Sequence, residues 1–266
     1  MRWAPGHRSP HVDDRRAHRA LGGLGLGRLG VGGIVLLLLL SLMFKRDFFT
    51  LVSDGDAAPL AGTLETTPEE ERLVAFVSFV FDTAQSTWTG ILEREGSRYQ
   101  PARLVLFRDA VQSACGFAQA VTGPFYCPAD ARVYIDLGFY DELSRQFGAP
   151  GDFAQAYVLA HEVGHHVQQL LGERRAGPAN AQSVRTELQA DCFAGIWGHH
   201  MARQGLLEPG DVEEGLGAAA AVGDDRLQRM AGGPVSPDDF THGTAVERAT
   251  AFRRGLESGR LDACPG

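Results

Sequence analysis

The stretch His161-Glu162-Val163-Gly164-His165 is the part of the chain from which both the fold and the chemistry can be built. Apolar residues recur around it at spacings of three and four, which predicts an amphipathic helix. We expect this helix to start after the turn at 150–152, with Asp152 as its N-cap, and to end at Gly172. Residues four apart share one helix face, so both histidines can reach one zinc ion while Glu162 faces its bound water.

Two histidines are too few for a catalytic zinc, which takes three protein ligands and leaves one position open. Glu187 and Asp191 are the only acids between residues 183 and 201, in a segment otherwise rich in apolar residues. Acids in an apolar helix are rarely buried unless they are paired or bind metal. One of them could bind zinc while the other accepts the free N–H of a ligand histidine. The alternatives are a capping or solvent-facing acid pair and two histidines in ordinary hydrogen bonds.

Residues 161–168 (HEVGHHVQ), 187–197 (ELQADCFAGIW) and 240–244 (FTHGT) resemble known proteins. An H-E-x-x-H motif followed by E-x-x-x-D is similar to the gluzincin metallopeptidases, the thermolysin-like clan. The three stretches together look like the bacterial neutral zinc metallopeptidase family of membrane-anchored proteins, from about Leu73 to the C-terminus. The resemblance implies a thermolysin-like zinc-helix core with a small sheet, and a peptide or protein substrate.

The resemblance also implies a role for each residue of the motifs. His161, His165 and Glu187 would bind one Zn2+ per chain, and Glu162 would be the general base. Asp191 would accept the remaining N–H of a ligand histidine, with His161 as the expected partner.

Hydrolysis would follow from these residue types. Zinc lowers the pKa of a bound water and polarises the scissile carbonyl, and Glu162 moves the water proton to the leaving amine. The oxyanion then needs a further donor, which gluzincins supply from a downstream His, Tyr or Arg. His242 is the candidate, with Arg248 further along the chain. A purely structural turn role for His242, beside Gly243, is an equal alternative, and for Tyr157 core packing is favoured over a place in the site.

Two other functions are compatible with such a site. One is a non-catalytic, zinc-stabilised envelope scaffold or chaperone, although a structural site has no use for a base beside an open coordination position. The other is a hydrolase of a non-peptide amide, such as a cell-wall component, that uses the same chemistry. Substrate profiling separates this second function from a peptidase.

An apolar run at 29–44 predicts a transmembrane anchor. It follows a basic segment at 1–28, so the positive-inside rule predicts a cytoplasmic tail and an extracytoplasmic domain. A linker at 45–67 would lead to a zinc metallopeptidase domain at 68–266. The expected location is the bacterial cytoplasmic membrane, with a single crossing; a cleaved signal peptide is the alternative.

Charge follows the same division of the chain. Residues 1–46 carry eight Arg or Lys and two Asp, whereas the remainder carries 17 basic and 31 acidic residues. An acidic domain of this kind excludes nucleic acid as a partner, because phosphate contacts need a basic patch. No feature of the sequence indicates an oligomeric state.

The four cysteines form no C-x-x-C motif, which argues against a second zinc site. An even number in an extracytoplasmic domain favours disulfides. Cys115 and Cys127 bracket a short loop or hairpin, and Cys192 would then pair with Cys264. The other pairings and reduced, buried thiols remain alternatives.

The remaining patterns predict an α+β fold that is mainly helical, with a small sheet. Helices are expected near 69–90, 211–229 and 245–256, and short strands at 104–107 and 133–136. In gluzincins a substrate peptide pairs with an edge strand above the zinc helix, and residues 132–137 are our candidate for part of that sheet.

Overall fold

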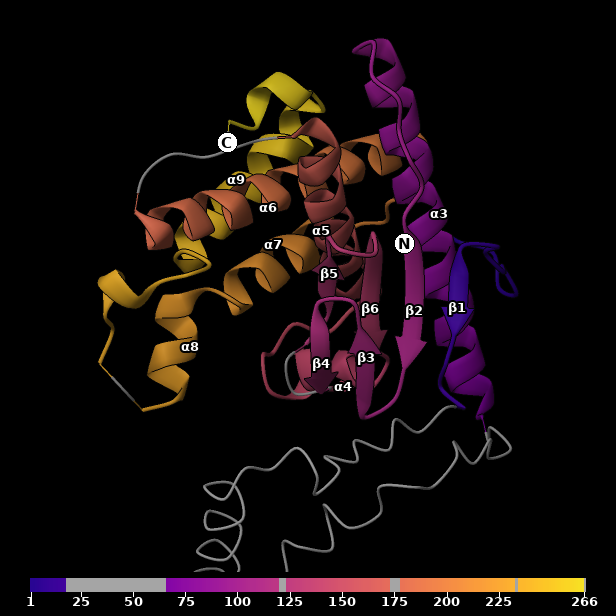
Figure 1. Cartoon of the computed structure of the whole chain (residues 1–266), viewed down its shortest axis with the longest axis horizontal. Coiled ribbons are helices and arrows are strands. Elements are labelled where there is room, and N and C mark those ends of the chain that lie inside the picture. The colour runs from indigo at the N-terminus through magenta and orange to yellow at the C-terminus, as the bar shows by residue number, and fades with distance from the viewer. Residues whose placement is uncertain (18–65, 120–122, 173–177, 233, 266) are drawn as a thin grey trace, which may run out of the picture.

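The computed structural model describes residues 1–17, 66–119, 123–172, 178–232 and 234–265. The fold is α+β and mainly helical, as the sequence predicts (Figure 1). Its strands are β1 (Val12–Asp14), β2 (Arg103–Phe107), β3 (Ala110–Ser113), β4 (Gly116–Gln119), β5 (Phe125–Cys127) and β6 (Arg132–Asp136). Its helices are α3 (Pro68–Arg94), α4 (Phe139–Arg145), α5 (Asp152–Leu171), α6 (Ala179–Arg203), α7 (Asp211–Ala221), α8 (Asp224–Met230) and α9 (Ala245–Ser258), with short 3-10 turns at Pro237–Asp239 and Leu261–Ala263.

Helix α5 carries the H-E-x-x-H motif and ends as predicted. Gly172 adopts a left-handed conformation, with φ of 67°, which favours glycine at the C-cap. The predicted start is wrong by one residue: the N-cap is Gly151, and Asp152 is the first helical residue. Glu214 of α7 accepts a hydrogen bond from the Phe153 backbone N–H at 3.1 Å, so a carboxylate from another helix serves the helix start.

The sheet has the strand order β1-β2-β6-β5. Strands β1, β2 and β6 are parallel, and β5 runs antiparallel to β6. Strand β6 therefore lies inside the sheet, between β2 and β5. The prediction that residues 132–137 form part of the sheet is confirmed by β6. Both sides of β6 are already paired, so the edge strand nearest α5 within the described residues is β5.

The core lies between α3, the sheet and the group of helices α5, α6, α7 and α9 (Figure 1). Trp88 of α3 packs edge-on against Phe193 of α6, with ring centroids 5.0 Å apart. Phe153 of α5 stacks on Trp197 of α6 at 5.6 Å. These four rings are fully buried, so the helices α3, α5 and α6 form one packed unit.

Glycines allow the helices to approach closely where the site is formed. A Cβ atom on Gly164, between the two motif histidines, would lie 3.0 Å from the carbonyl oxygen of Ala190 in α6. A Cβ on Gly255 of α9 would lie 1.9 Å from the carbonyl oxygen of Cys192, which is closer than atoms can approach. Helices α5 and α9 therefore both contact the backbone of α6 around Glu187 and Asp191.

The structure divides one of the expected helices and shows where residues 1–17 pack. The helix expected near 211–229 is divided into α7 and α8, because Gly223 interrupts it where the chain passes close to the start of α9. Residues 1–17, which the sequence assigns to a basic tail at 1–28, lie along α3 and contribute β1 to the sheet.

Among the described residues, every helix is too short or too polar to cross a membrane. The predicted anchor at 29–44 and nearly all of the predicted linker at 45–67 fall outside the described residues.

Candidate metal centre

Helices α5 and α6 bring His161, His165 and Glu187 together. The Nε2 atom of His161 lies 3.1 Å from one Glu187 oxygen, and Nε2 of His165 lies 3.5 Å from the other. One donor atom from each of the three residues falls within 4.8 Å of the others. Two imidazole nitrogens and one carboxylate oxygen at this separation can hold a single tetrahedral ion with one position free.

Asp191 orients the first of these histidines. Its Oδ1 atom lies 2.7 Å from Nδ1 of His161, so the imidazole donates there and leaves Nε2 for a metal. Arg248 of α9 donates two hydrogen bonds to the same carboxylate, at 2.8 and 2.9 Å, and the Tyr157 hydroxyl donates a third at 2.5 Å. Asp191 is fully buried, and this set of donors compensates its charge.

These contacts shift the ionisation of the site. Burial alone would lower the pKa of His161, but Asp191 and Glu187 raise it to about 10. Burial would raise the pKa of Glu187, yet the two histidines and Arg248 lower it strongly. A carboxylate that stays ionised is a competent metal ligand, and metal binding would release the proton held by His161.

The second histidine is oriented from its own helix. The Nδ1 atom of His165 lies 3.0 Å from the side-chain oxygen of Gln168. The amide nitrogen of Gln168 in turn donates to the Thr186 carbonyl at 2.7 Å, next to Glu187. Gln168 thus fixes the imidazole and ties α5 to α6 at the level of the site, a role for which the sequence carried no signal.

The three residues open into a cleft of about 680 Å³. Glu162 and His242 both line it, together with apolar residues of β5, α4, α5 and α8. Glu162 is 7% exposed and lines the same cleft as the candidate metal ligands. The structure therefore places the predicted base and the predicted oxyanion donor on the same cleft.

His242 is held by Asp224, which the sequence reasoning missed. The Nδ1 atom of His242 lies 3.1 Å from Oδ1 of Asp224. The other oxygen of Asp224 accepts the backbone N–H groups of residues 241, 242 and 243 at 2.6–3.0 Å. One carboxylate thus fixes the whole turn. No spacing rule connects Asp224 to residues 241–243, so only the fold could show it.

Arg248 and Tyr157 both belong to the hydrogen-bond network around Asp191. Arg248, which the sequence offered as an alternative oxyanion donor, is 4% exposed and bound to Asp191. Tyr157 is core-packed as expected, but its hydroxyl also belongs to the hydrogen-bond network of Asp191. Both residues support the orientation of His161.

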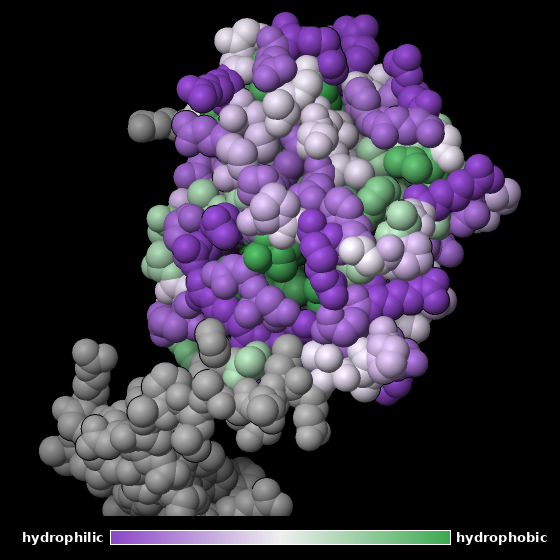
Figure 2. All heavy atoms as spheres, turned by 90° about the vertical axis from the view of Figure 1, so that its right-hand side faces the viewer, coloured by the Kyte–Doolittle hydropathy of each residue, from purple (hydrophilic) through white to green (hydrophobic). Residues whose placement is uncertain are grey.

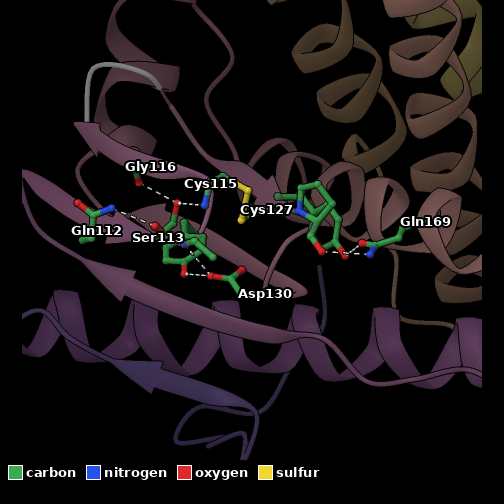
Figure 3. The surroundings of a disulfide bond; sticks show 11 residues. Gln112, Ser113, Cys115, Gly116, Cys127, Asp130 and Gln169 are labelled. Carbon is green, nitrogen blue, oxygen red and sulfur yellow. Dashed lines mark hydrogen bonds between the residues drawn. A yellow bond between two sulfur atoms is a disulfide. The ribbon is translucent and has the colours of Figure 1, made fainter.

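Strand β5 borders the cleft, and contacts of Tyr126 and Cys127 hold it in place. The Tyr126 hydroxyl lies 2.9 Å from Nδ1 of His166 on α5 and also hydrogen-bonds Gln169. Cys127 is joined to Cys115 at the turn of the β3–β4 hairpin, and Figure 3 shows Gln169 reaching toward this strand from α5. The edge strand is therefore fixed relative to the candidate metal ligands.

The structure contains both disulfides that the cysteine positions favoured. Cys115 pairs with Cys127, and Cys192 pairs with Cys264. The second bridge joins the C-terminal segment to α6 one residue after Asp191. Gln189 strengthens that junction by donating to the Cys264 carbonyl at 3.1 Å.

A second cluster of side chains among the described residues has donor atoms spaced as in a metal site. It consists of Asp152, Asp211 and Glu214. The Met1 amino group already lies among these acids, 2.8 Å from Asp152 and 3.3 Å from Asp211. Carboxylates alone, with an ammonium group as partner, do not match the imidazole-rich donor set of a zinc site.

Two imidazoles, one carboxylate, a neighbouring glutamate and an open cleft form the donor arrangement of a mononuclear zinc hydrolase centre. The chain belongs to the protein family described as "Putative neutral zinc metallopeptidase", whose model matches residues 1–266. This confirms the resemblance found in the sequence.

The chain is also similar to individual bacterial proteins. It is 46% identical to "Uncharacterized protein YpfJ" of Escherichia coli strain K12 over 281 residues, which cover 99% of this chain and 98% of that protein. It is 43% identical to "Uncharacterized protein Rv2575" of Mycobacterium tuberculosis strain H37Rv over 182 residues, which cover 62% of each chain. No solved structure matches it.

Proposed function

We propose that the protein hydrolyses peptide bonds with one zinc ion held by His161, His165 and Glu187. The single observation that carries this proposal is the convergence of these three donors on a cleft that Glu162 also lines. When bound, zinc supplies a Lewis acid that polarises a carbonyl and makes water a nucleophile near neutral pH.

Glu162 is the proposed general base. It lines the same cleft as the two histidines of its own helix, and the residue is mostly buried. It would accept the proton of the attacking water and deliver it to the amine of the leaving peptide. Asp191, Arg248 and Tyr157 hold His161 in the tautomer that exposes Nε2.

His242 is the proposed donor to the oxyanion. Asp224 engages its Nδ1 atom, which leaves Nε2 as the nitrogen for a substrate oxygen. Half of its side chain is exposed, so it is accessible to substrate. A charged or neutral donor held ready in a partly desolvated cleft lowers the energy of the tetrahedral state.

Strand β5 is the proposed pairing edge for an extended peptide, in the manner of the thermolysin-like clan. It is the sheet edge nearest the site helix, and Phe125 and Tyr126 line the cleft. Main-chain pairing gives affinity independent of sequence, while the apolar lining that Val158, Val222 and Leu227 provide favours an apolar side chain next to the cleaved bond.

The cysteines support a proposal for the compartment. All four are in disulfides, which persist in oxidising compartments. We therefore propose that the domain functions outside the cytoplasm of a bacterium.

Two alternative functions make different predictions. A zinc-stabilised scaffold would fill all ligand positions with protein atoms, whereas here a glutamate and an open cleft adjoin the donors. A hydrolase of non-peptide amides would use the same groups on a different substrate.

The proposal is tested by incubating the zinc-loaded protein with an unbiased peptide library and sequencing the products. We expect cleavage next to apolar residues, abolished by a chelator and restored by added zinc. A folded, zinc-loaded protein that leaves every peptide intact, but releases amide-linked fragments from purified cell wall, would replace the peptidase proposal with the second alternative. Inactivity on both substrates would favour the scaffold.

A further inference from the structure

Residues 1–17 are integrated into the domain through its sheet. Strand β1 pairs in parallel with β2, with Val12, Asp13 and Asp14 opposite Leu104, Val105 and Leu106. The Leu104 N–H donates to the His11 carbonyl at 3.0 Å, and the Arg15 N–H donates to the Leu106 carbonyl at 2.8 Å. These bonds cover one side of a strand whose side chains form the core.

The segment before β1 runs along α3 and is held by its side chains. Trp3 packs against Phe76 with ring centroids 5.3 Å apart. His7 and Ser9 both bind the carboxylate of Asp82, at 2.8 and 2.6 Å. Trp3, His7 and Ser9 therefore hold the segment against α3 along most of its length.

The arginines of this segment are neutralised within the molecule. Arg16 is 3% exposed and lies 2.6 Å from Asp14 and 3.0 Å from Glu70 and Glu71. Arg8 also reaches Glu71 at 2.6 Å, and Arg15 reaches Asp13 at 2.7 Å. The side of the molecule that carries α3 and β1 is mainly hydrophilic (Figure 2).

These contacts have a consequence for membrane topology. Backbone hydrogen bonds require atoms about 3 Å apart, whereas a bilayer separates its two faces by about 30 Å of hydrocarbon. Residues on opposite sides of a membrane cannot belong to one sheet.

We propose that residues 1–17 are a structural part of the peptidase domain and lie on its side of the membrane. The arginines that suggested a cytoplasmic tail then serve as partners of Glu70, Glu71 and their neighbours. A single crossing at 29–44 with flanks on opposite sides is incompatible with this proposal. The inference does not depend on the proposed peptidase activity, because it rests on the sheet and on α3.

Sided labelling of the full-length chain in intact bacterial cells tests the proposal. Pro5→Cys and Val246→Cys each add one thiol at an exposed position, in the segment and in the domain. The parent chain, whose cysteines are paired, is the control for background. We expect a membrane-impermeant maleimide to label both variants to the same extent in intact cells, and again after permeabilisation. Labelling of only one of the two in intact cells would overturn the proposal.

Cross-linking tests the contact itself. Ser9→Cys with Asp82→Cys places two thiols where the native side chains meet at 2.6 Å. Ser9→Cys with Arg94→Cys is the matched control, because residue 94 lies about 18 Å further along α3. A short bis-maleimide should link the first pair and spare the second. Equal yields, or none in the first pair with both thiols reactive, would contradict the proposal.

Stability gives a readout that needs no thiols. Arg16→Ala removes a buried guanidinium from three carboxylates, and Arg8→Ala removes an exposed one from Glu71. If the segment belongs to the domain, the melting temperature should fall by on the order of 5 °C in the first variant and by about 1 °C or less in the second. An unchanged melting temperature for Arg16→Ala would overturn the structural role.

Discussion

At the scale of single residues, the site depends on one buried carboxylate. Asp191 binds His161, Arg248 and Tyr157 and is fully enclosed. It makes no contact with the cleft, so its effect on chemistry passes through the imidazole of His161. Residues of this kind tune metal affinity without touching substrate.

Asp191→Asn is therefore expected to weaken zinc binding by about 10- to 100-fold, because the amide is a poorer acceptor for the His161 N–H. Competition with a chromophoric chelator measures the change. Asp262→Asn, at an exposed acid paired with Arg260, is the matched control and should bind zinc like the parent chain. Equal affinities for both variants would show that Asp191 does not support the metal.

At the scale of secondary-structure elements, the approach of α9 to α6 places Arg248 beside Asp191. Gly195 and Gly255 make the approach possible, since a Cβ on either would enter the backbone of the facing helix. The zinc ligands of the proposal lie on α5 and α6, so α9 contributes by packing and by one cation.

Gly255→Ala should destabilise the fold by at least about 1–3 kcal/mol, because the added methyl group must push the helices apart. Gly217→Ala on α7 is the control: its Cβ would meet nothing within 4 Å, and the higher helix propensity of alanine should stabilise slightly. Denaturant unfolding measures both. A neutral Gly255→Ala would mean that α6 and α9 pack less closely than the distances at Gly255 indicate.

We expect one disulfide to contribute more to stability and the other more to activity. Cys192–Cys264 closes 72 residues and Cys115–Cys127 closes 12, so serine replacement of the first pair should cost about 1.5 kcal/mol more by loop entropy. Cys115–Cys127 anchors β5 beside the cleft. Its replacement should therefore lower kcat/KM more than replacement of Cys192–Cys264 does, although it costs less stability. Unfolding curves and cleavage rates of both double-serine variants test this. A larger loss of stability without Cys115–Cys127, or a larger loss of kcat/KM without Cys192–Cys264, would contradict these roles.

At the scale of the whole molecule, we expect the packing of the N-terminal segment against α3 to depend on pH. Burial alone would raise the pKa of Glu70, but hydrogen bonds from Arg108 and Arg16 lower it below its usual 4.5. A carboxyl group whose pKa is lowered by folding stabilises the fold above its unfolded pKa, and this stabilisation disappears as the pH falls through the folded pKa.

We therefore expect residues 1–17 to loosen below about pH 4.5, as protonation of Glu70 weakens its ion pair with Arg16. Protease cleavage within the segment, followed from pH 7 to pH 3 with an acid-tolerant enzyme, measures the release. Glu70→Gln lacks one of the titrating partners and should show a shallower pH dependence. Identical profiles would exclude Glu70 as a source of the effect.

The sequence predicted the parts of the fold that short-range patterns determine. The H-E-x-x-H helix, the acids Glu187 and Asp191 in an apolar segment, and the cysteine pairs all carry local or compositional signals. Strand β5 was missed because three residues between turns show no periodicity. Asp224 was missed because its partners lie 17–19 residues away.

The N-terminal segment shows that one pattern of charges is compatible with two different roles. Arg8, Arg15 and Arg16 before an apolar run are typical of a topological signal. The same arginines have carboxylate partners on α3 and within the segment, which only the packed arrangement reveals. The sequence shows that these arginines need negatively charged partners, but only the fold shows which carboxylates they contact.

The most direct test of the central claim measures zinc content and peptide cleavage on the same samples of the parent chain and Glu162→Gln. The account predicts one zinc per chain in both proteins, with cleavage by the variant slower by about 10²- to 10⁴-fold, because the base is lost while the ligands remain. A variant that cleaves at the parental rate, or that no longer holds zinc, would contradict the account.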